Sequence, residues 1–369
     1  MNQLFRWNQM GLFLLALAAG ILPFAVPEVC AAALQEGLTL CSGPLLLSLF
    51  PFLVVSRLLI QCPESDLLAL PFRLAAWGIG IRTPCAARVL CIGFLGGFAP
   101  AANAAAQAVR TGQLTVEEAD ALLPACICSG PSFVVLTVGQ SLLGSAELGV
   151  LLFASQITAN YLTAALLNRF AGVRSVKPES AAPASPAPPR LDEILADAAI
   201  TYCKLCGFIL FFRMLAAGAG ALLPAGAGTL CAVLLEVCSG CDLASRTGRW
   251  GSLLCCAALS VQGLSVLLQV RTICPPEITL RPLYRSRLLH LPLSLALFYL
   301  LLPGGEVDVF STLPARVLLM RRVPPDCALL VFAVCCMAAC TLRSGIRQVE
   351  QKQMARNAGG CCINSKTLL

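Results

Sequence analysis

Charged residues are scarce in this sequence of 369 residues. Only 12% of them are Asp, Glu, Lys or Arg, against roughly 25% in an ordinary soluble domain. Hydrophobic residues make up 58% of the chain, and the mean hydropathy is +0.81. A soluble fold could not cover its surface from this composition, so the scarcity of charge predicts a protein whose partner is the lipid bilayer.

Histidine is almost absent, and this excludes much catalytic and metal-binding chemistry. His290 is the single histidine, which supplies a zinc site poorly. The sequence has no P-loop, no G-x-S-x-G motif and no pair of carboxylates with a recognisable catalytic spacing. We therefore predict no catalytic residue, no metal site and no cofactor, and we do not expect an enzyme.

Cysteine, in contrast, is abundant, at 21 residues. Two Cys-x-x-Cys spacings, Cys203 with Cys206 and Cys238 with Cys241, would indicate metal or redox chemistry in a soluble chain. Many of the other cysteines lie inside apolar runs, where cysteine acts as a small hydrophobe that lets helices pack closely. We interpret the cysteines as structural.

The excess of basic residues gives a net charge of +7. These residues flank apolar runs and form no basic face with interleaved aromatics, so a nucleic-acid partner is not expected. Basic connections between spans usually stay in the cytoplasm. On this rule the cytoplasmic segments are Arg6, the loop with Arg57, Arg73, Arg82 and Arg88, the loop from Arg271 to Arg287, and the C-terminal tail.

Long runs without any charged residue carry the main structural signal, because roughly 20 apolar residues span the hydrocarbon core as a helix. Nine such runs occur, at 11–27, 37–56, 89–109, 121–146, 148–168, 214–235, 250–270, 288–305 and 327–342. A further apolar helix is expected at 198–213, with Lys204 and Arg213 facing head groups or the protein interior. The prediction is an all-α integral membrane protein, a polytopic bundle of about 8–10 segments.

The N-terminal segment has two readings. Arg6, the apolar run from Gly11 to Val26 and the three alanines at 31–33 also resemble a cleavable signal peptide. Retention as the first span is favoured, because the next apolar run begins only at Gly37 and the two would form a hairpin.

Proline divides the chain into two halves. Residues 178–189 read PESAAPASPAPP, a composition that forms no packed helix. The predicted organisation is a first membrane half at 1–170, a Pro-rich extramembrane linker at 171–190, a second membrane half at 191–342 and a basic tail at 343–369. The motifs Arg110-Thr111-Gly112 and Arg246-Thr247-Gly248 are a weak internal sequence similarity between the halves. Such a similarity is typical of transporter repeats but is also compatible with chance.

Two apolar runs of the first half contain residues that interrupt a helix. The run 89–109 holds Gly93, Gly96, Gly97 and Pro100, followed by Asn103. In the run 121–146, the segment Ser129-Gly130-Pro131-Ser132 has the same effect. Broken helix at membrane depth is tolerated where it is buried in protein or lines a cavity, so both runs are predicted to be broken or re-entrant. A glycine-rich packing interface is the competing interpretation of the first run.

The second half and the end of the first contain polar residues within apolar runs. Glu236 precedes Ser239 and Gly240, and an acid near membrane depth indicates either function or an ordinary helix end. Gln262, Ser265 and Gln269 share one helix face if the helix continues through Gly263. The span 148–168 carries Ser155, Gln156, Asn160 and Thr163, so it is expected to face the bundle interior.

The order of these motifs resembles the YlbJ family of sporulation integral membrane proteins, part of the group with the nucleoside-recognition or Gate domain. The matching segments are Leu49-Phe50-Pro51-Phe52-Leu53, Gly97-Phe98, Thr115-Val116-Glu117-Glu118-Ala119, Gly130-Pro131-Ser132-Phe133, Leu235-Glu236, Ser239-Gly240-Cys241, Gly263-Leu264-Ser265-Val266 and Gln269. The chain departs from the family pattern at Ala99-Pro100-Ala101 and at Ile127-Cys128, where the family has Pro-x-Gly and paired asparagines. The resemblance implies a multi-pass protein of the cell membrane or the forespore membrane, with Gate-like halves.

These observations together predict a sporulation-associated membrane protein that transports or senses a small polar solute. The rival prediction is a membrane scaffold for spore-envelope assembly, which would bind other membrane proteins instead of a solute. The residues predicted to line the solute site are Gly97, Asn103, Ser129, Gly130, Pro131, Ser132, Glu236, Gly240, Gln262, Gly263, Ser265 and Gln269.

Overall fold

The computed structural model describes residues 2–61, 65–172 and 191–302. Within these ranges the chain is entirely helical, with no β-strand, which confirms the predicted all-α class. The Pro-rich linker from residue 173, the apolar run 327–342 and the basic tail lie outside the described residues.

Three helical segments are long and apolar enough to cross a membrane: Ala146–Ala171, Leu191–Leu222 and Gly248–Ile273, the last of which is interrupted at Gln262. A fourth candidate is the pair Leu15–Ala25 and Pro27–Ser42, which is bent by 110°. The chain is thus a membrane protein. Four of the other apolar runs, 37–56, 89–109, 121–146 and 214–235, are divided into shorter helices.

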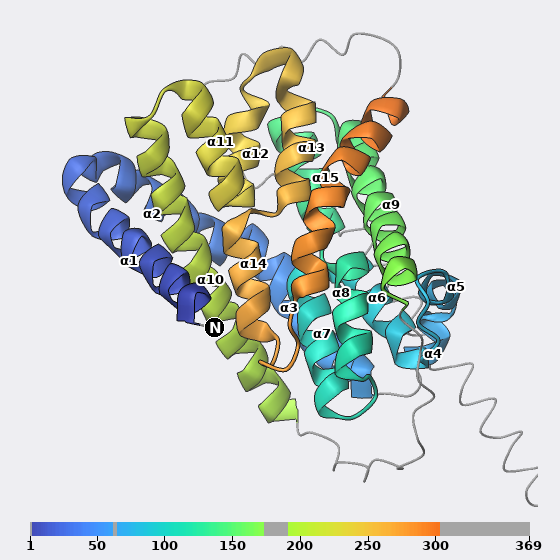
Figure 1. Cartoon of the computed structure of the whole chain (residues 1–369). Helices are drawn as coiled ribbons and strands as arrows, with labels where there is room; N and C mark the ends of the chain where they lie inside the picture. The colour runs from blue at the N-terminus through green and yellow to red at the C-terminus, as the bar shows by residue number, and fades with distance from the viewer. Residues whose placement is uncertain (1, 62–64, 173–190, 303–369) are drawn as a thin grey trace, which may run out of the picture.

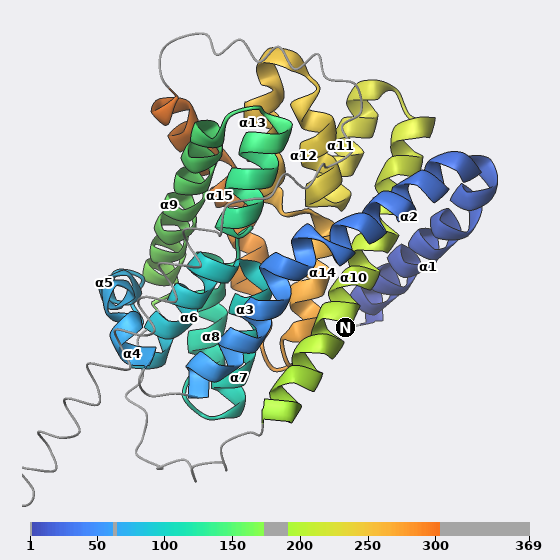
Figure 2. The same cartoon turned by 180° about the vertical axis from the view of Figure 1, so that it is seen from behind.

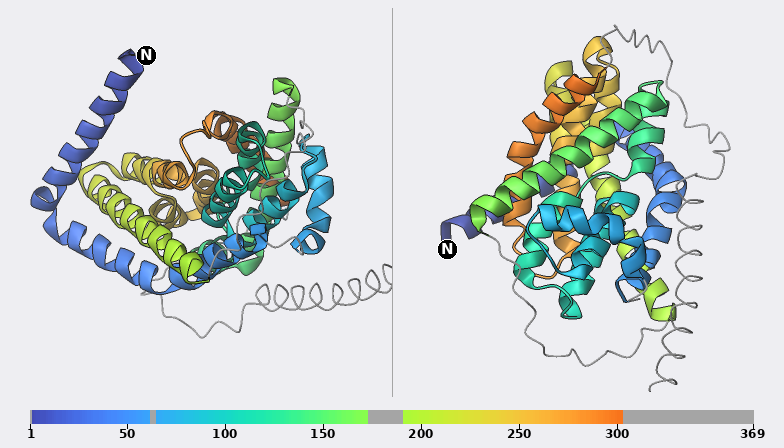
Figure 3. Two further views of the ribbon diagram at one scale, coloured as in Figure 1. Left: turned by 90° about the horizontal axis from the view of Figure 1, so that it is seen from below. Right: turned by 90° about the vertical axis from the view of Figure 1, so that its right-hand side faces the viewer.

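The first half begins with the bent helix pair α1 and α2, which lies at the edge of the bundle (Figure 3). Helix α2 packs against the long helix α10, and α3 lies beside α10 on the same face (Figure 2). The elements of the first half are α1 (Asn2–Ala25), α2 (Pro27–Ser42), α3 (Pro44–Gln61), α4 (Ser65–Leu68), α5 (Leu70–Gly78), α6 (Pro84–Gly96), α7 (Phe98–Arg110), α8 (Val116–Cys126), the π-helix η1 (Ser132–Leu142) and α9 (Ala146–Ala171).

Helices α6 and α7 form a re-entrant hairpin. A Cβ placed on Gly93 would lie 3.2 Å from Cβ of Ala101, whereas residues eight apart on a straight helix are about 12 Å apart. The chain therefore folds back at Gly97. The next two segments, α8 and η1, instead continue from one side toward the other, and α9 returns beside η1.

The second half repeats this order. Its elements are α10 (Leu191–Leu222), α11 (Ala225–Leu235), α12 (Val237–Ser245), the 3₁₀ turn η2 (Gly248–Trp250), α13 (Gly251–Val261), α14 (Gly263–Ile273) and α15 (Arg281–Leu301). A Cβ on Gly240 would lie 2.8 Å from Cα of Val233, so α11 and α12 also fold back on each other. Helices α13 and α14 then form a broken span, and α15 returns beside α13.

The two halves have opposite orientations. The α7–α8 turn lies at the bottom of the molecule and the α12–α13 turn at the top (Figure 1). Arg110-Thr111-Gly112 and Arg246-Thr247-Gly248 occupy these two turns, and both glycines have positive φ, +68° and +65°. Each half thus has a hairpin, a broken span and a return helix, which is the pattern of an inverted repeat.

Two predicted segments differ from the structure. The run 214–235 is not one span, because α10 continues to Leu222 and the chain turns at Pro224 into α11. Gly228 packs against the backbone of Gly220 across this turn. The run 37–56 is also divided, at Gly43 between α2 and α3. Both turns consist of uncharged residues, so a count of charge-free runs does not detect them.

The basic residues assigned to a loop or to the helix 198–213 have varied environments. Arg88 is buried in α6 and donates to the carbonyl of Ile60 at 2.8 Å and to Oε1 of Gln113 at 2.7 Å. Arg213 pairs with Glu36 at 2.6 Å, whereas Lys204 is exposed. Arg88 is therefore not a loop residue, because its guanidinium satisfies carbonyls at the end of α3.

The connection between α14 and α15 is held by Asp120 of α8. Its carboxylate accepts hydrogen bonds from Thr279 N at 3.1 Å, Thr279 Oγ1 at 2.6 Å and Leu280 N at 2.8 Å. Leu280 has a φ of +57°, a conformation that bulky residues adopt rarely. The Asp120 carboxylate thus fixes the strained residue from which α15 begins.

Replacement of Asp120 by alanine is expected to lower the free energy of unfolding by about 2 kcal/mol, because the buried Leu280 N–H and the partly buried donors of Thr279 lose their acceptor. Thermal unfolding of the purified chain, followed with a thiol-reactive dye, measures the change. The control is Asp242→Ala, which removes an ion pair to Arg246 on the surface of α12 and should cost at most about 0.5 kcal/mol. Equal shifts for the two variants would contradict the anchoring role of Asp120.

Candidate functional site

The four helix interruptions lie together at the centre of the fold. We call them the break cluster: Gly97, the segment 127–131, Glu236 and the pair Gln262–Gly263. A Cβ on Gly97 would lie 2.6 Å from Gly130 N, and one on Gly263 would lie 3.0 Å from Glu236 N. Within each half, the tip of the hairpin therefore touches the break of the crossing span. Gln262 links the halves, since its Nε2 lies 3.4 Å from Ser129 Oγ.

Glycine and proline explain the interruptions of the first half. Gly97 has φ +80° and ψ −162°, a region that is accessible to glycine almost alone. In the other break, Pro131 has no N–H to continue the ladder from α8. The segment 127–131 is extended at Ile127, and η1 begins at Ser132 as a π-helix. These breaks agree with the predicted ones.

Glu236 creates the third interruption. It is 2% exposed and serves as the N-cap of α12. Its Oε1 accepts from Cys238 N at 2.8 Å, and its Oε2 accepts from Ser239 N at 2.7 Å and Ser239 Oγ at 2.9 Å. A carboxylate at this position satisfies the first amides of α12 and complements its dipole. The acid therefore marks a helix end, as one of the two predicted alternatives stated, and that end is buried.

Gln262 and Gly263 form the fourth interruption, with φ +66° and +69°. A left-handed glutamine is uncommon and indicates local strain. Its Nε2 donates to the carbonyl of Leu259 at 2.6 Å, and its buried Oε1 has no partner. The helix does not continue through Gly263, so the condition for a shared face of Gln262, Ser265 and Gln269 is not met. Only Ser265 and Gln269 share a face, on α14, where they are joined by a hydrogen bond of 2.9 Å.

Two further predicted site residues lie away from the breaks. Asn103 is buried on α7 and donates to Ser56 Oγ of α3 at 3.3 Å. Gly240 lies inside α12 and allows that helix to approach Val233 of α11. Both contribute to helix packing.

The break cluster adjoins polar residues of α9, as their number in that span predicted. Ser155, Gln156, Asn160 and Thr163 are all at most 2% exposed. Asn160 Nδ2 donates to the carbonyl of Ile127 at 3.4 Å, which ties α9 to the first-half break. Gln156 Nε2 donates to Ser260 Oγ of α13 at 3.0 Å. The interior-facing orientation of α9 is thereby confirmed.

Sequence reasoning missed the polar face of α15. Arg287 was assigned to a cytoplasmic loop, but it is 8% exposed and approaches Asn160 and Ser260. His290 is 1% exposed, and its Nε2 lies 3.2 Å from the carbonyl of Gln156. Ser294 bonds to Ser260. The spacing of Arg287, His290 and Ser294, three and then four residues, is the signal that could have revealed this face.

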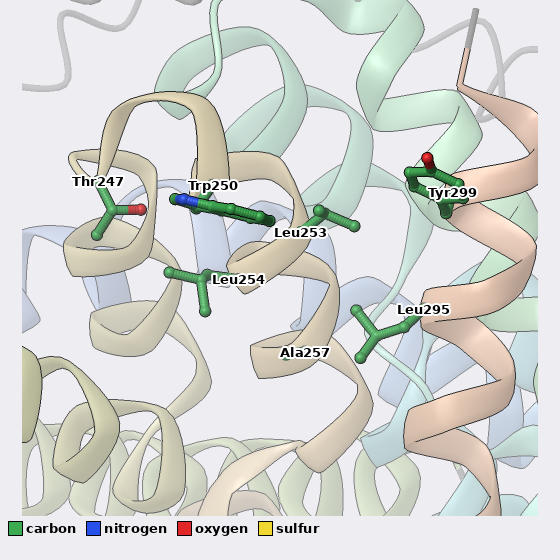
Figure 4. Close-up of a pocket in the computed structure, with 7 residues that line it drawn as sticks. All are labelled: Thr247, Trp250, Leu253, Leu254, Ala257, Leu295 and Tyr299. Atoms are coloured by element: carbon green, nitrogen blue, oxygen red, sulfur yellow. The ribbon is translucent and has the colours of Figure 1, made fainter. Parts of the chain in front are cut away.

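An apolar groove with a volume of about 480 Å³ lies between α13 and α15, away from the break cluster (Figure 4). No predicted site residue contributes to it. Its lining consists of Thr247, Trp250, Leu253, Leu254, Ala257, Leu295 and Tyr299. Such a surface suits lipid chains, and it offers almost no polar group for a polar solute.

In comparisons with other proteins, no family model matches the chain, and no curated protein or solved structure is significantly similar to it. Among the described residues, no group of three or more His, Cys, Asp or Glu side chains is arranged to hold a metal ion.

Proposed function

We propose that this chain is a membrane transport-type protein that binds a small polar solute at the break cluster. The observation that carries the proposal is the convergence of four helix interruptions from two oppositely oriented halves. Secondary transporters place substrate sites between inverted repeats, where broken helices present free backbone groups. The resemblance to the Gate-domain group supports the same function, and it suggests a location in the cell membrane or forespore membrane of a sporulating cell.

The chemistry of the cluster also supports a polar solute. Unpartnered oxygen atoms belong to two buried amides, each 1% exposed: Gln262 in the cluster and Gln269 farther along α14, the helix that begins at the cluster. A buried acceptor without a donor is unfavourable by about 1–3 kcal/mol. A solute with hydroxyl or amide N–H groups would supply the missing donors.

The experiment is solute uptake into phosphatidylcholine vesicles that contain the purified full chain. Radiolabelled uridine, adenosine, uracil and succinate serve as probes. Gln269→Leu should reduce uptake about tenfold, the loss of one hydrogen bond in the binding step. Protein levels should stay close to those of the wild type, because Oε1 has no partner and the side-chain bond that is lost is the one from Nε2 to Ser265 Oγ. The matched control, Gln140→Leu, alters an exposed glutamine of η1 and should leave uptake unchanged.

Uptake of none of the probes above that of empty vesicles would contradict transport. Stable crosslinks to other membrane proteins, together with this absence of flux, would favour the rival scaffold function. Equal uptake by the Gln269→Leu variant and the wild type would contradict the placement of the solute site.

A further inference from the structure

Arg287 is the one buried cation of the described core that lacks a carboxylate partner. Its guanidinium contacts two neutral acceptors at long distances, Ser260 O at 3.5 Å and Asn160 Oδ1 at 3.3 Å. Its Nε has no hydrogen-bond partner. The half-buried or buried arginines 57, 88 and 213 differ, because each pairs with a carboxylate, that of Asp197, Asp66 and Glu36 respectively.

A buried guanidinium with neutral partners is unfavourable, because its charge loses hydration and gains no counter-charge. Arginine cannot escape this cost by losing its proton. Its planar fork of donors does match a carboxylate or a phosphate, which it binds through two parallel hydrogen bonds. The arrangement around Arg287 is thus unfavourable when empty and favourable when it holds an oxyanion.

The position of Arg287 connects it to the break cluster on two sides. Asn160 accepts from Arg287 and donates to the carbonyl of Ile127 in the first-half break. Ser260, the other contact, lies two residues before Gln262 in the second-half break. An anion beside Arg287 would therefore lie next to the proposed solute site.

Three helices that begin at these breaks have no side-chain cap. They are α7, η1 and α14, whereas α12 is capped by the carboxylate of Glu236. Free N-terminal amides carry a partial positive charge that favours anions. The chain provides its own anion for α12 and leaves an unpaired cation beside the breaks that precede η1 and α14.

We propose that the solute bound at the break cluster carries an oxyanion, a carboxylate or a phosphate, which Arg287 binds. This inference rests on the proposed function and specifies its substrate class. Asn160 and Ser260 position the guanidinium, and the uncapped amides add to the favourable potential.

The test measures thermal unfolding of the purified full chain in a neutral detergent, with a thiol-reactive dye that reports the buried cysteines. Sodium phosphate, acetate and succinate are compared with sodium chloride at equal ionic strength. In the wild type, a bound anion should raise the midpoint by roughly 3 °C for each tenfold excess over its dissociation constant. The phosphate and carboxylate arms identify which oxyanion fits.

The variants separate a binding role from a structural one. Arg287→Met should lose the anion response, and its midpoint in chloride should rise, because an uncompensated charge has been removed. Arg287→Lys keeps the charge and loses the fork, so its response should be weaker by about tenfold. The matched control is Arg57→Gln, which breaks the ion pair with Asp197 and should respond as the wild type does.

The inference would be overturned if the wild type responded to none of the three anions. It would also be overturned by an undiminished response in Arg287→Met or, if that variant does not fold, in Arg287→Lys. Stabilisation by phosphatidylglycerol in the micelle without a soluble anion would assign the site to a lipid headgroup and also overturn it. Uridine uptake into vesicles without any anion response would refute this inference and leave the proposed function intact. Anion binding without uptake of any probe would contradict transport and leave the anion site at Arg287 intact.

Discussion

Alanine at Gly97 is expected to prevent accumulation of the folded protein. Gly97 adopts φ +80° and ψ −162°, and a residue with a side chain there is strained by about 1–3 kcal/mol. The added Cβ would also lie 2.6 Å from Gly130 N and 3.2 Å from Cys128 O. Both neighbours are backbone atoms, which cannot rotate away as a flexible side chain can.

Overpacking of this kind adds about 1–3 kcal/mol. The sum is a large share of the roughly 5–15 kcal/mol that stabilises a typical protein. The damage extends beyond one turn, because Gly97 is the point where the first hairpin touches the first-half break. We therefore expect both the hairpin and the α8–η1 span to lose their arrangement.

The yield of monodisperse protein in detergent and its thermal midpoint measure this effect. Gly112→Ala is the matched control, because Gly112 also has a positive φ, +68°, but has no heavy atom within 4 Å of the added Cβ. That variant should lose only about 1–2 kcal/mol. Gly263→Ala should fall between them, since its Cβ would lie 3.0 Å from Glu236 N and Leu235 O. A Gly97 variant no less stable than the Gly112 variant would refute the close contact.

The sequence could predict the first-half breaks because they are caused locally. Gly97 and the Gly130-Pro131 pair disrupt a helix wherever they occur, and an apolar run around them implies a position at membrane depth. The second-half breaks carry no such signal. Leu235 and Val237 are ordinary helix residues, and the break between them is made by the Glu236 carboxylate, which caps α12. Gln262 has no intrinsic preference for a left-handed conformation, and Gly263 beside it lies against the backbone of Leu235 and Glu236 across the fold.

Arg287 illustrates a second limit of sequence reasoning. A basic residue near the start of an apolar run is usually at the membrane surface, and the positive-inside rule relies on that average. The α14–α15 connection is held deep against α8 by Asp120, so α15 begins with Leu280 and Leu283 already buried. Arg287, less than two turns into the helix, then reaches the core. Hydropathy describes the segment but not the depth at which its connection is anchored.

Glu236 provides the second large expected effect. Alanine there would leave three buried donors, Cys238 N, Ser239 N and Ser239 Oγ, without their acceptor. Each such donor is unfavourable by about 1–3 kcal/mol, and α12 would also lose the charge that complements its N-terminus. We expect the free energy of unfolding to fall by about 4 kcal/mol, which thermal unfolding in detergent would measure.

Conservative variants of Glu236 distinguish the carboxylate from the side-chain volume. Aspartate is a favoured N-cap and should lose at most about 1 kcal/mol. Glutamine keeps one acceptor but directs an NH₂ donor at an amide donor, so its stability should lie between those of aspartate and alanine. Glu147→Ala is the control, because Glu147 lies in the first turn of α9 but is exposed, and its loss should be about 0.3–1 kcal/mol. If alanine at positions 236 and 147 gave equal shifts, the carboxylate of Glu236 would not be what holds the second hairpin at the break cluster. If glutamine matched the wild type in stability but abolished uptake, the carboxylate would belong to the solute site instead of to the cap.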